Sequence, residues 1–327
     1  MTTLELPAPP TADTRPAFRN GHRRHVLDLD DFTRTEIEEV LETTASMKEV
    51  LGRTIKQVPA LRGKTVVNMF FEESTRTRIS FELAARALSA NVVSMSAKGS
   101  SVEKGESLLD TVRTLQALGG DVLVMRHSQS GAPYFVAQHF RGSVLNAGDG
   151  RHAHPTQALL DLFTIYDKLG RIEGLKIVIV GDIVHSRVAR SNLWGMTAMG
   201  AHVTLCAPHT LLGRPGFWKA TWPQVHITTD LDEAVTDADV IMTLRLQKER
   251  QESGLLPTLR EYSRFFGVNA ERVRQAAPHC LVMHPGPMNE GVEITPDVAT
   301  SAQSVIEEQV TNGVAVRMAM LYRLAGE

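Results

Sequence analysis

Residues 61–88 read LRGKTVVNMFFEESTRTRISFELAARAL, and the order of apolar and polar residues in this stretch decides the fold class. The apolar run that ends at Phe71, after the turn at Gly63-Lys64, predicts a short buried strand. The segment 80–88 (SFELAARAL) predicts a helix. A strand, a short polar turn and a helix are the repeating parts of an open, mostly parallel sheet.

The same alternation continues beyond this stretch and restarts in the second half of the chain. We expect helices at 28–51, 107–118, 155–170, 190–200 and 304–326, and strands at 91–97, 121–127, 143–150, 175–182, 202–208, 237–244 and 279–285. A chain of 327 residues is long enough for about two domains. The pattern therefore predicts an α/β fold with two domains, each a mostly parallel sheet flanked by helices. The boundary is expected near residue 155, with a small-molecule cleft between the domains.

The composition narrows the classes of partner. Lys plus Arg is 35 and Asp plus Glu is 37, so the formal net charge is -2. Without an overall positive field, neither nucleic acid nor an acidic membrane surface is an expected partner, and any anion site must concentrate positive charge locally. No apolar run approaches the ~18 residues that a membrane span needs. Residues 1–24 lack the apolar stretch of a signal peptide, and their Pro, Thr and Arg content predicts a flexible tail.

The two cysteines point to a reducing compartment. Cys206 and Cys280 lie far apart in the sequence and form no CxxC pair. We therefore expect neither a disulfide framework nor a zinc site built from cysteines. A cytoplasmic location is expected instead.

The polar segment Ser74–Arg78 (STRTR) is the densest chemical signal. It lies between the expected strand and helix, so its residues stand at a helix N-terminus, where free N–H groups and the dipole favour an anion. Hydroxyl groups and guanidinium groups add donors that suit phosphate. The alternative is a plain N-cap beside solvated arginines. No GxxxxGK[ST] motif is present, which disfavours nucleotide hydrolysis.

A family resemblance rests on this segment and on six others that follow it in order. The segment 71–82 (FEESTRTRISFE) is similar to the carbamoyl-phosphate-binding signature of the aspartate/ornithine carbamoyltransferase family. The resemblance continues through 100–111, 125–132, 152–162, 181–192, 245–250 and 284–294, collinear from about residue 25 to the end. It implies a carbamoyl-phosphate-binding domain over 25–155, to which the C-terminal helix 303–327 returns, and an aspartate-binding domain over 156–302.

On the carbamoyl-phosphate side, Arg126 stands at a strand's carboxyl end, where open sheets place ligands, although such arginines also form surface ion pairs. His154 and Gln157 are three residues apart at a helix start and share one face; a lone histidine is more often structural. The resemblance implies that His154 donates to the carbamoyl oxygen and Gln157 accepts from the NH2 group. The other residues implied on this side are Ser74, Thr75, Arg76, Thr77, Ser100 and Lys104.

On the acceptor side, Arg187 is expected in the loop after the strand at 175–182. Arg245 and Gln247 alternate after the strand at 237–244, so their side chains point the same way. The alternative for this segment is a solvated loop. A substrate with two carboxylates needs two guanidinium groups, and Arg187 and Arg245 would supply them. Gly286 and Pro287 belong to a rigid turn whose carbonyls suit an amino group. The GDIVHS segment lacks GxGxxG, which argues against dinucleotide binding.

The resemblance implies transfer of the carbamoyl group from carbamoyl phosphate to the α-amine of L-aspartate, the committed step of de novo pyrimidine biosynthesis. The HPGP segment at 284–287 favours aspartate over ornithine, since ornithine enzymes carry HCLP there. The expected catalytic residues are Arg76 and Lys104 toward the phosphate, and Thr77, Arg126 and His154 toward the oxyanion. No metal or organic cofactor is called for, and no HExxH spacing is present.

The resemblance also implies partners. In the family, the loop that carries Ser100 and Lys104 enters the neighbouring subunit's site, so a homotrimer with shared sites is expected, although a lone lysine is usually just solvated. A regulatory chain or a dihydroorotase partner stays open. Glu290 stands where many relatives carry arginine, but not at a direct ligand position. Two other functions also stay open: a non-catalytic phosphate-binding scaffold, and transfer to ornithine or another amino acid.

Overall fold

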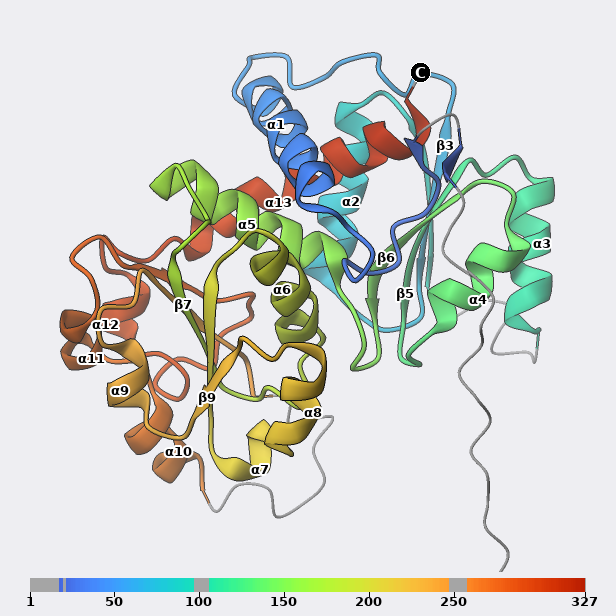
Figure 1. Ribbon diagram of the computed structural model, residues 1–327. Helices are drawn as coiled ribbons and strands as arrows, with labels where there is room; N and C mark the ends of the chain where they lie inside the picture. Colours follow the sequence, from blue (N-terminus) through green and yellow to red (C-terminus); the bar gives the residue numbers. More distant parts are fainter. Residues whose placement is uncertain (1–17, 20–21, 97–105, 247–257, 327) are drawn as a thin grey trace, which may run out of the picture.

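The computed structural model describes residues 18–19, 22–96, 106–246 and 258–326. Within these ranges the chain forms two parallel sheets flanked by helices, as predicted (Figure 1). A two-stranded antiparallel hairpin, β1 (Phe18–Arg19) and β2 (His22–Arg23), precedes them.

The first sheet has the strand order β4-β3-β5-β6, and all its pairs are parallel. Its strands are β3 (Thr65–Phe70), β4 (Asn91–Ser96), β5 (Val122–His127) and β6 (Ser143–Asp149). Every residue of β3 after the first is buried, and so is all of β6. Because helices cover both faces of such a sheet, its central strands β3 and β5 are nearly continuous apolar runs rather than alternating ones, which made them easy to find.

The second sheet has the order β11-β10-β7-β8-β9 and is also parallel throughout. Its strands are β7 (Lys176–Val180), β8 (His202–Cys206), β9 (His226–Thr228), β10 (Val240–Thr243) and β11 (Leu281–Met283). The strand β9 has only three residues and was not predicted.

The long helices match the predicted ones, with shifts at their first residues. They are α1 (Arg34–Leu51), α2 (Thr75–Ala87), α3 (Leu108–Ala117), α5 (Pro155–Leu169), α6 (Arg187–Ala198) and α13 (Ile306–Ala325). Helix α1 begins late because Thr33 and Glu36 form a capping box. The placement of Arg187 in a loop was wrong: it is the first residue of α6, because Ser186 caps that helix.

Seven short helices were not predicted. They are α4 (Ala132–His139), α7 (His209–Leu212), α8 (Pro215–Thr221), α9 (Leu231–Val235), α10 (Leu259–Phe266), α11 (Ala270–Gln275) and α12 (Pro296–Ala299). Helices of one or two turns are too short to display a hydrophobic period, so their sequences read as connections.

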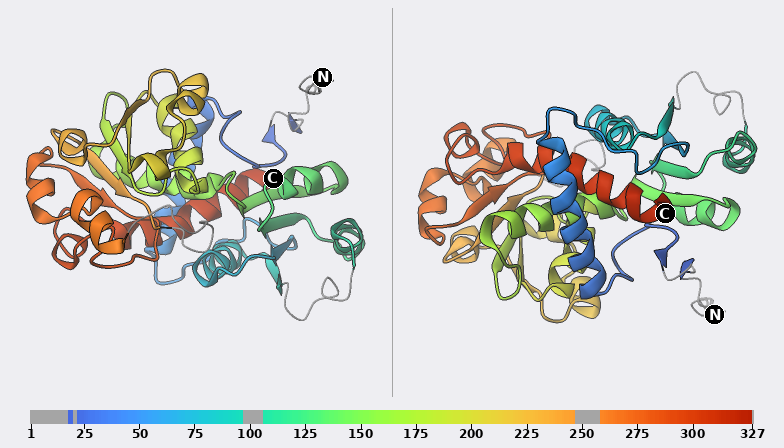
Figure 2. Two further views of the ribbon diagram at one scale, coloured as in Figure 1. Left: turned by 90° about the horizontal axis from the view of Figure 1, so that it is seen from below. Right: turned by 90° about the horizontal axis from the view of Figure 1, so that it is seen from above.

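Helices α5 and α13 join the two halves. Helix α13 packs against α1, α2 and α5, so the C-terminal helix returns to the first half as expected; Figure 2 shows it beside α1. Helix α5 packs against α13 and also against α6 of the second half. Residues 155–165 of α5 are all buried, as in a helix enclosed on every side. No helix in the described part of the chain is long and apolar enough to cross a membrane.

Candidate active site between the two sheets

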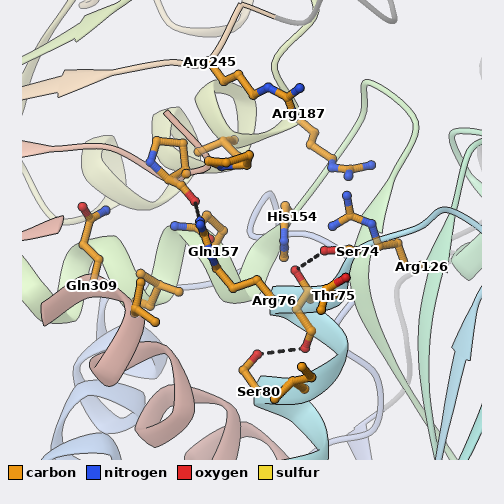
Figure 3. Close-up of a pocket in the computed structure, with 18 of the residues that line it drawn as sticks. Ser74, Thr75, Arg76, Ser80, Arg126, His154, Gln157, Arg187, Arg245 and Gln309 are labelled. Carbon is orange, nitrogen blue, oxygen red and sulfur yellow. Dashed lines mark hydrogen bonds between the residues drawn. The ribbon is translucent and has the colours of Figure 1, made fainter. Parts of the chain in front are cut away.

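A cleft of about 840 Å³ lies where the carboxyl ends of both sheets meet (Figure 3). Its walls come from the residues after β3, β7, β10 and β11, from Arg126 near the end of β5, and from one side of α5 and of α13. The volume is that of a site for small molecules, and carboxyl ends of parallel strands are the usual place for one.

The first turn of α2 faces this cleft, and within the described ranges no side chain accepts a hydrogen bond from its first backbone N–H groups. Ser74 stands at the N-cap, but its side chain makes no capping hydrogen bond to the turn, and its Oγ donates to Thr77 Oγ1 at 2.9 Å. No acidic residue lies in this turn. The first N–H groups of a helix have no partners within it, so this turn can bind an anion, as the STRTR segment predicted.

Arg76 reaches from α2 across the cleft to the turn after β11. Its Nη1 donates to the carbonyl of Pro285 at 3.1 Å, across 209 residues of sequence. Gly286 has a φ of +62°, and a Cβ there would collide with the Arg76 guanidinium. Only glycine therefore allows this close approach. Gly286 and Pro287 both line the cleft, as predicted, but the turn's Pro285 carbonyl is occupied by Arg76.

Glu72 joins the two predicted ligand sites, and the sequence analysis did not assign it a role. Its Oε1 accepts from Arg126 Nη2 and from Arg187 Nη2, both at 2.6 Å, and its Oε2 accepts from Arg187 Nη1 at 3.1 Å. The Arg187 side chain is 5% exposed and that of Glu72 is 22% exposed. The sequence did contain a signal for this role, because Glu72 is a carboxylate beside the STRTR segment, whose side chains are all hydrogen-bond donors.

Arg126 lies at an irregularity of the first sheet. The pairing of β5 with β6 shifts register between Met125 and His127. Such a bulge re-aims a side chain, and Arg126 lines the cleft, where its Nη1 also donates to the Ala147 carbonyl at 3.4 Å. The backbone shift thus turns a strand residue toward the site.

His154 and Gln157 both line the cleft at the start of α5 and are nearly buried. His154 is the N-cap residue of α5, and its backbone N–H donates to Ser191 Oγ at 2.9 Å. Ser191 in turn donates to the buried carboxylate of Asp28 at 2.8 Å. The first turn of α5 is therefore held by both halves of the chain.

The turn after β11 is fixed by a neutral histidine. Burial lowers the pKa of His284 to about 3, and Arg76 and Arg245 act in the same direction. The uncharged ring accepts from the Gly286 N–H through Nδ1 at 2.8 Å. Arg245 lines the cleft beside this turn, while the predicted residues Ser100, Lys104 and Gln247 lie outside the described residues. Glu290 is exposed and does not line the cleft.

Positive charge is concentrated in the cleft. Among the described residues, its walls carry five arginines and two glutamates: Arg76, Arg126, Arg187, Arg245 and Arg317, with Glu72 and Glu73. Burial lowers the pKa of Arg317 to about 10, which leaves it charged at neutral pH. Because the chain has a net charge of -2, an anion site was expected to need a local excess of positive charge, and the cleft has one. No group of three His, Cys, Asp or Glu in the described ranges is placed to hold a metal ion.

Comparisons with known proteins agree across the chain. Residues 24–167 match the family model "Aspartate/ornithine carbamoyltransferase, carbamoyl-P binding domain", and residues 173–324 match "Aspartate/ornithine carbamoyltransferase, Asp/Orn binding domain". The aspartate carbamoyltransferase catalytic subunit of Roseiflexus sp. (strain RS-1) is 80% identical over 94% of this chain and 97% of its own length.

Two solved structures are similar to the whole fold. One is aspartate transcarbamoylase from Trypanosoma cruzi in complex with N-(phosphonacetyl)-L-aspartic acid, with a TM-score of 0.86, 32% identity and coverage of 93% and 96%. The other is ornithine carbamoyltransferase from Pyrococcus furiosus, with a TM-score of 0.82, 31% identity and coverage of 92% and 97%.

Proposed function

This chain belongs to the aspartate/ornithine carbamoyltransferase family, and we propose that its cleft transfers the carbamoyl group from carbamoyl phosphate to the α-amine of L-aspartate. The products are N-carbamoyl-L-aspartate and phosphate, and the reaction is the committed step of de novo pyrimidine biosynthesis. One observation supports the reaction above all. Guanidinium groups from both halves, Arg76 and Arg126 from one and Arg187 and Arg245 from the other, line the same cleft.

The phosphate of the donor binds at the first turn of α2. Its dianion accepts from the N–H groups of that turn, from the hydroxyl of Thr75, from Arg76, and from the Ser74 hydroxyl once its hydrogen turns from Thr77 to the phosphate. Ser100 and Lys104 complete this set from a neighbouring subunit. The same groups hold the phosphate as it leaves with its growing charge.

The carbonyl oxygen becomes an oxyanion when the amine attacks, and three donors stabilise it. In the empty cleft Thr77 Oγ1 accepts from Ser74, and the Thr77 hydroxyl keeps its own hydrogen to donate to the oxyanion. Arg126 and His154 complete the group, and each well-placed donor contributes about 3 kcal/mol in the transition state. The new C–N bond forms first and gives the tetrahedral intermediate. The oxyanion then re-forms the carbonyl as the C–O bond to phosphate breaks, and the leaving phosphate takes the proton of the amine. Positioning two bound reactants supplies much of the rate without a covalent nucleophile.

L-Aspartate binds through its two carboxylates to Arg187 and Arg245, with Gln247 beside them. Since Glu72 holds Arg187 in the empty cleft, the substrate must compete with this carboxylate for the guanidinium. The turn at Gly286 and Pro287 faces the amine.

The acceptor is tested directly with purified protein. We expect carbamoyl phosphate and L-aspartate to yield N-carbamoyl-L-aspartate, whereas L-ornithine at the same concentration yields no citrulline. Carbamoylation of ornithine but not of aspartate would overturn the assignment of the acceptor. Absence of transfer to either, with phosphate still bound, would favour a non-catalytic phosphate-binding subunit.

The assembly follows from the same proposal: a cytoplasmic homotrimer in which each site borrows Lys104 from a neighbour, with or without a regulatory or dihydroorotase partner. Inactive Arg76→Ala and Lys104→Ala subunits, mixed and reassembled, are expected to regain partial activity. Each mixed trimer then contains at least one site with both native residues. No recovery after reassembly, verified by mass, contradicts shared sites.

A further inference from the structure

Asp161 on α5 accepts hydrogen bonds from three side-chain amides that lie on three helices. Its Oδ1 accepts from Gln157 Nε2 at 3.0 Å and from Gln309 Nε2 at 2.8 Å, and its Oδ2 accepts from Asn192 Nδ2 at 2.8 Å. These donors come from α5, α13 and α6. Asp161 is fully buried and does not line the cleft, so it touches no substrate itself.

An ionised carboxylate only accepts hydrogen bonds, so each amide must turn its NH2 group toward Asp161 and its carbonyl oxygen away. Gln309 displays this orientation independently, because its Oε1 accepts from the His284 backbone N–H at 2.9 Å. Gln157 lines the cleft beside His154 (Figure 3). Because its Nε2 donates to Asp161, its oxygen is turned away from that carboxylate.

The charge state of Asp161 supports this orientation. Burial raises its pKa to about 6, against the three amides and the nearby Arg317, which act to lower it. At pH 8 the group is therefore ionised and has no hydrogen to donate. The amide of Gln157 cannot turn over without placing its oxygen against a buried carboxylate.

We propose, as an extension of the proposed function on which it rests, that Asp161 is a positioning residue that makes the cleft selective for acyl phosphates whose acyl group carries an NH2. It holds the Gln157 oxygen as the acceptor for the carbamoyl NH2 group. If the Gln157 amide turned over, its NH2 group would face the carbamoyl NH2 group, and neither donor would have an acceptor. Acetyl phosphate has a methyl group in place of the NH2, so its binding does not depend on which end of the amide faces it.

The test is the ratio of kcat/KM for carbamoyl phosphate to that for acetyl phosphate at saturating L-aspartate. For Asp161→Ala we expect this ratio to fall about 10- to 100-fold. Asp161→Leu, which fills the volume, provides the same test if the alanine variant does not fold. If acetyl phosphate is not turned over, its inhibition constant replaces its kcat/KM.

Asp161→Asn is expected to retain most of the selectivity. Its single oxygen can face Gln157 and Gln309 while its NH2 donates to the oxygen of an inverted Asn192. Asn192→Leu is the matched control, since it removes an amide from the same carboxylate but not the one in the cleft. It should leave the ratio within about 3-fold of the native value. In a Gln157→Met background, Asp161→Ala should not change the ratio further.

Equal losses with both acyl phosphates, leaving the ratio unchanged in the alanine and leucine variants, would show that Asp161 is merely structural. A further fall in the Gln157→Met background would show that it does not act through Gln157. If the native protein transfers no carbamoyl group to aspartate, the proposed function fails, and that outcome is seen before any variant is made.

Discussion

Helices α2 and α6 both begin where a central strand ends at the cleft, α2 after β3 and α6 after β7. Their first turns differ. Ser74 leaves the first turn of α2 uncapped, whereas the Ser186 side chain accepts from the Ala189 N–H at 3.1 Å and closes the first turn of α6. Arg76 is exposed at the open turn, and Arg187 is buried at the closed one.

This difference relates each half to its ligand. A compact dianion such as phosphate can accept from several backbone N–H groups and one guanidinium together, so an open turn suits it. A carboxylate is planar and pairs with a single guanidinium through two parallel hydrogen bonds. In the second half the helix terminus can therefore be capped, because in the proposed function the side chains of Arg187 and Arg245 bind the substrate.

Arg76→Ala should cause the largest loss, because it removes the only side-chain cation of the α2 turn that points into the cleft in the described ranges. We expect kcat to fall at least about 100-fold, since the leaving phosphate carries its greatest charge in the transition state. Steady-state kinetics at saturating substrates measure this. Arg187→Ala is the contrasting variant and should mainly raise KM for aspartate. More than about a tenth of the native kcat in Arg76→Ala would remove its assigned role.

Glu72→Gln should have an intermediate effect, because it removes the carboxylate that holds Arg126 and Arg187 across the two halves. We expect the free energy of unfolding to fall by about 2 kcal/mol, less than for a fully buried pair, because 22% of the Glu72 side chain is exposed. KM for aspartate should rise roughly 10-fold, since Arg187 is no longer held in place.

Glu73→Gln is the matched control for this variant, because the same change falls on an exposed neighbour. Urea unfolding and aspartate titrations compare the two. Equal effects would mean that only the total charge of the cleft matters, not the bridge through Glu72.

Substitution of the two N-cap serines should produce the smallest effects, Ser186→Ala mainly on stability and Ser74→Ala mainly on phosphate binding. Ser186→Ala should lower the free energy of unfolding by about 1 kcal/mol, the usual value of an N-cap hydrogen bond. Ser74→Ala should cost less than about half of that, because its side chain caps nothing, yet it should weaken phosphate binding about 3-fold to 10-fold. Urea unfolding and calorimetric phosphate titration distinguish them. If both serines mainly affect stability, the contrast between an open and a closed turn is wrong.

Much of this arrangement was predictable because its signals are local in the chain. The apolar runs of β3 and β7 and the long helices are continuous segments, so length and hydrophobic pattern identified them. The chemistry of Ser74–Arg76 was also local, since a strand followed by a polar turn and a helix places these residues at an N-terminus. The short helices α7 to α12 had no comparable signal.

The sequence by itself determined the parallel α/β architecture, and the segment Ser74–Arg78 predicted an anion site in the first half, because both follow from residues adjacent in the chain. Only the tertiary structure decided that Glu72 bridges Arg126 and Arg187, and that Arg76 meets the carbonyl of Pro285. The same holds for Asp161, whose partner Gln309 lies 148 residues away. The physical reason is that a carboxylate or a carbonyl in a sequence does not reveal its partner. The packing of α5 and α13 between the two sheets selects it.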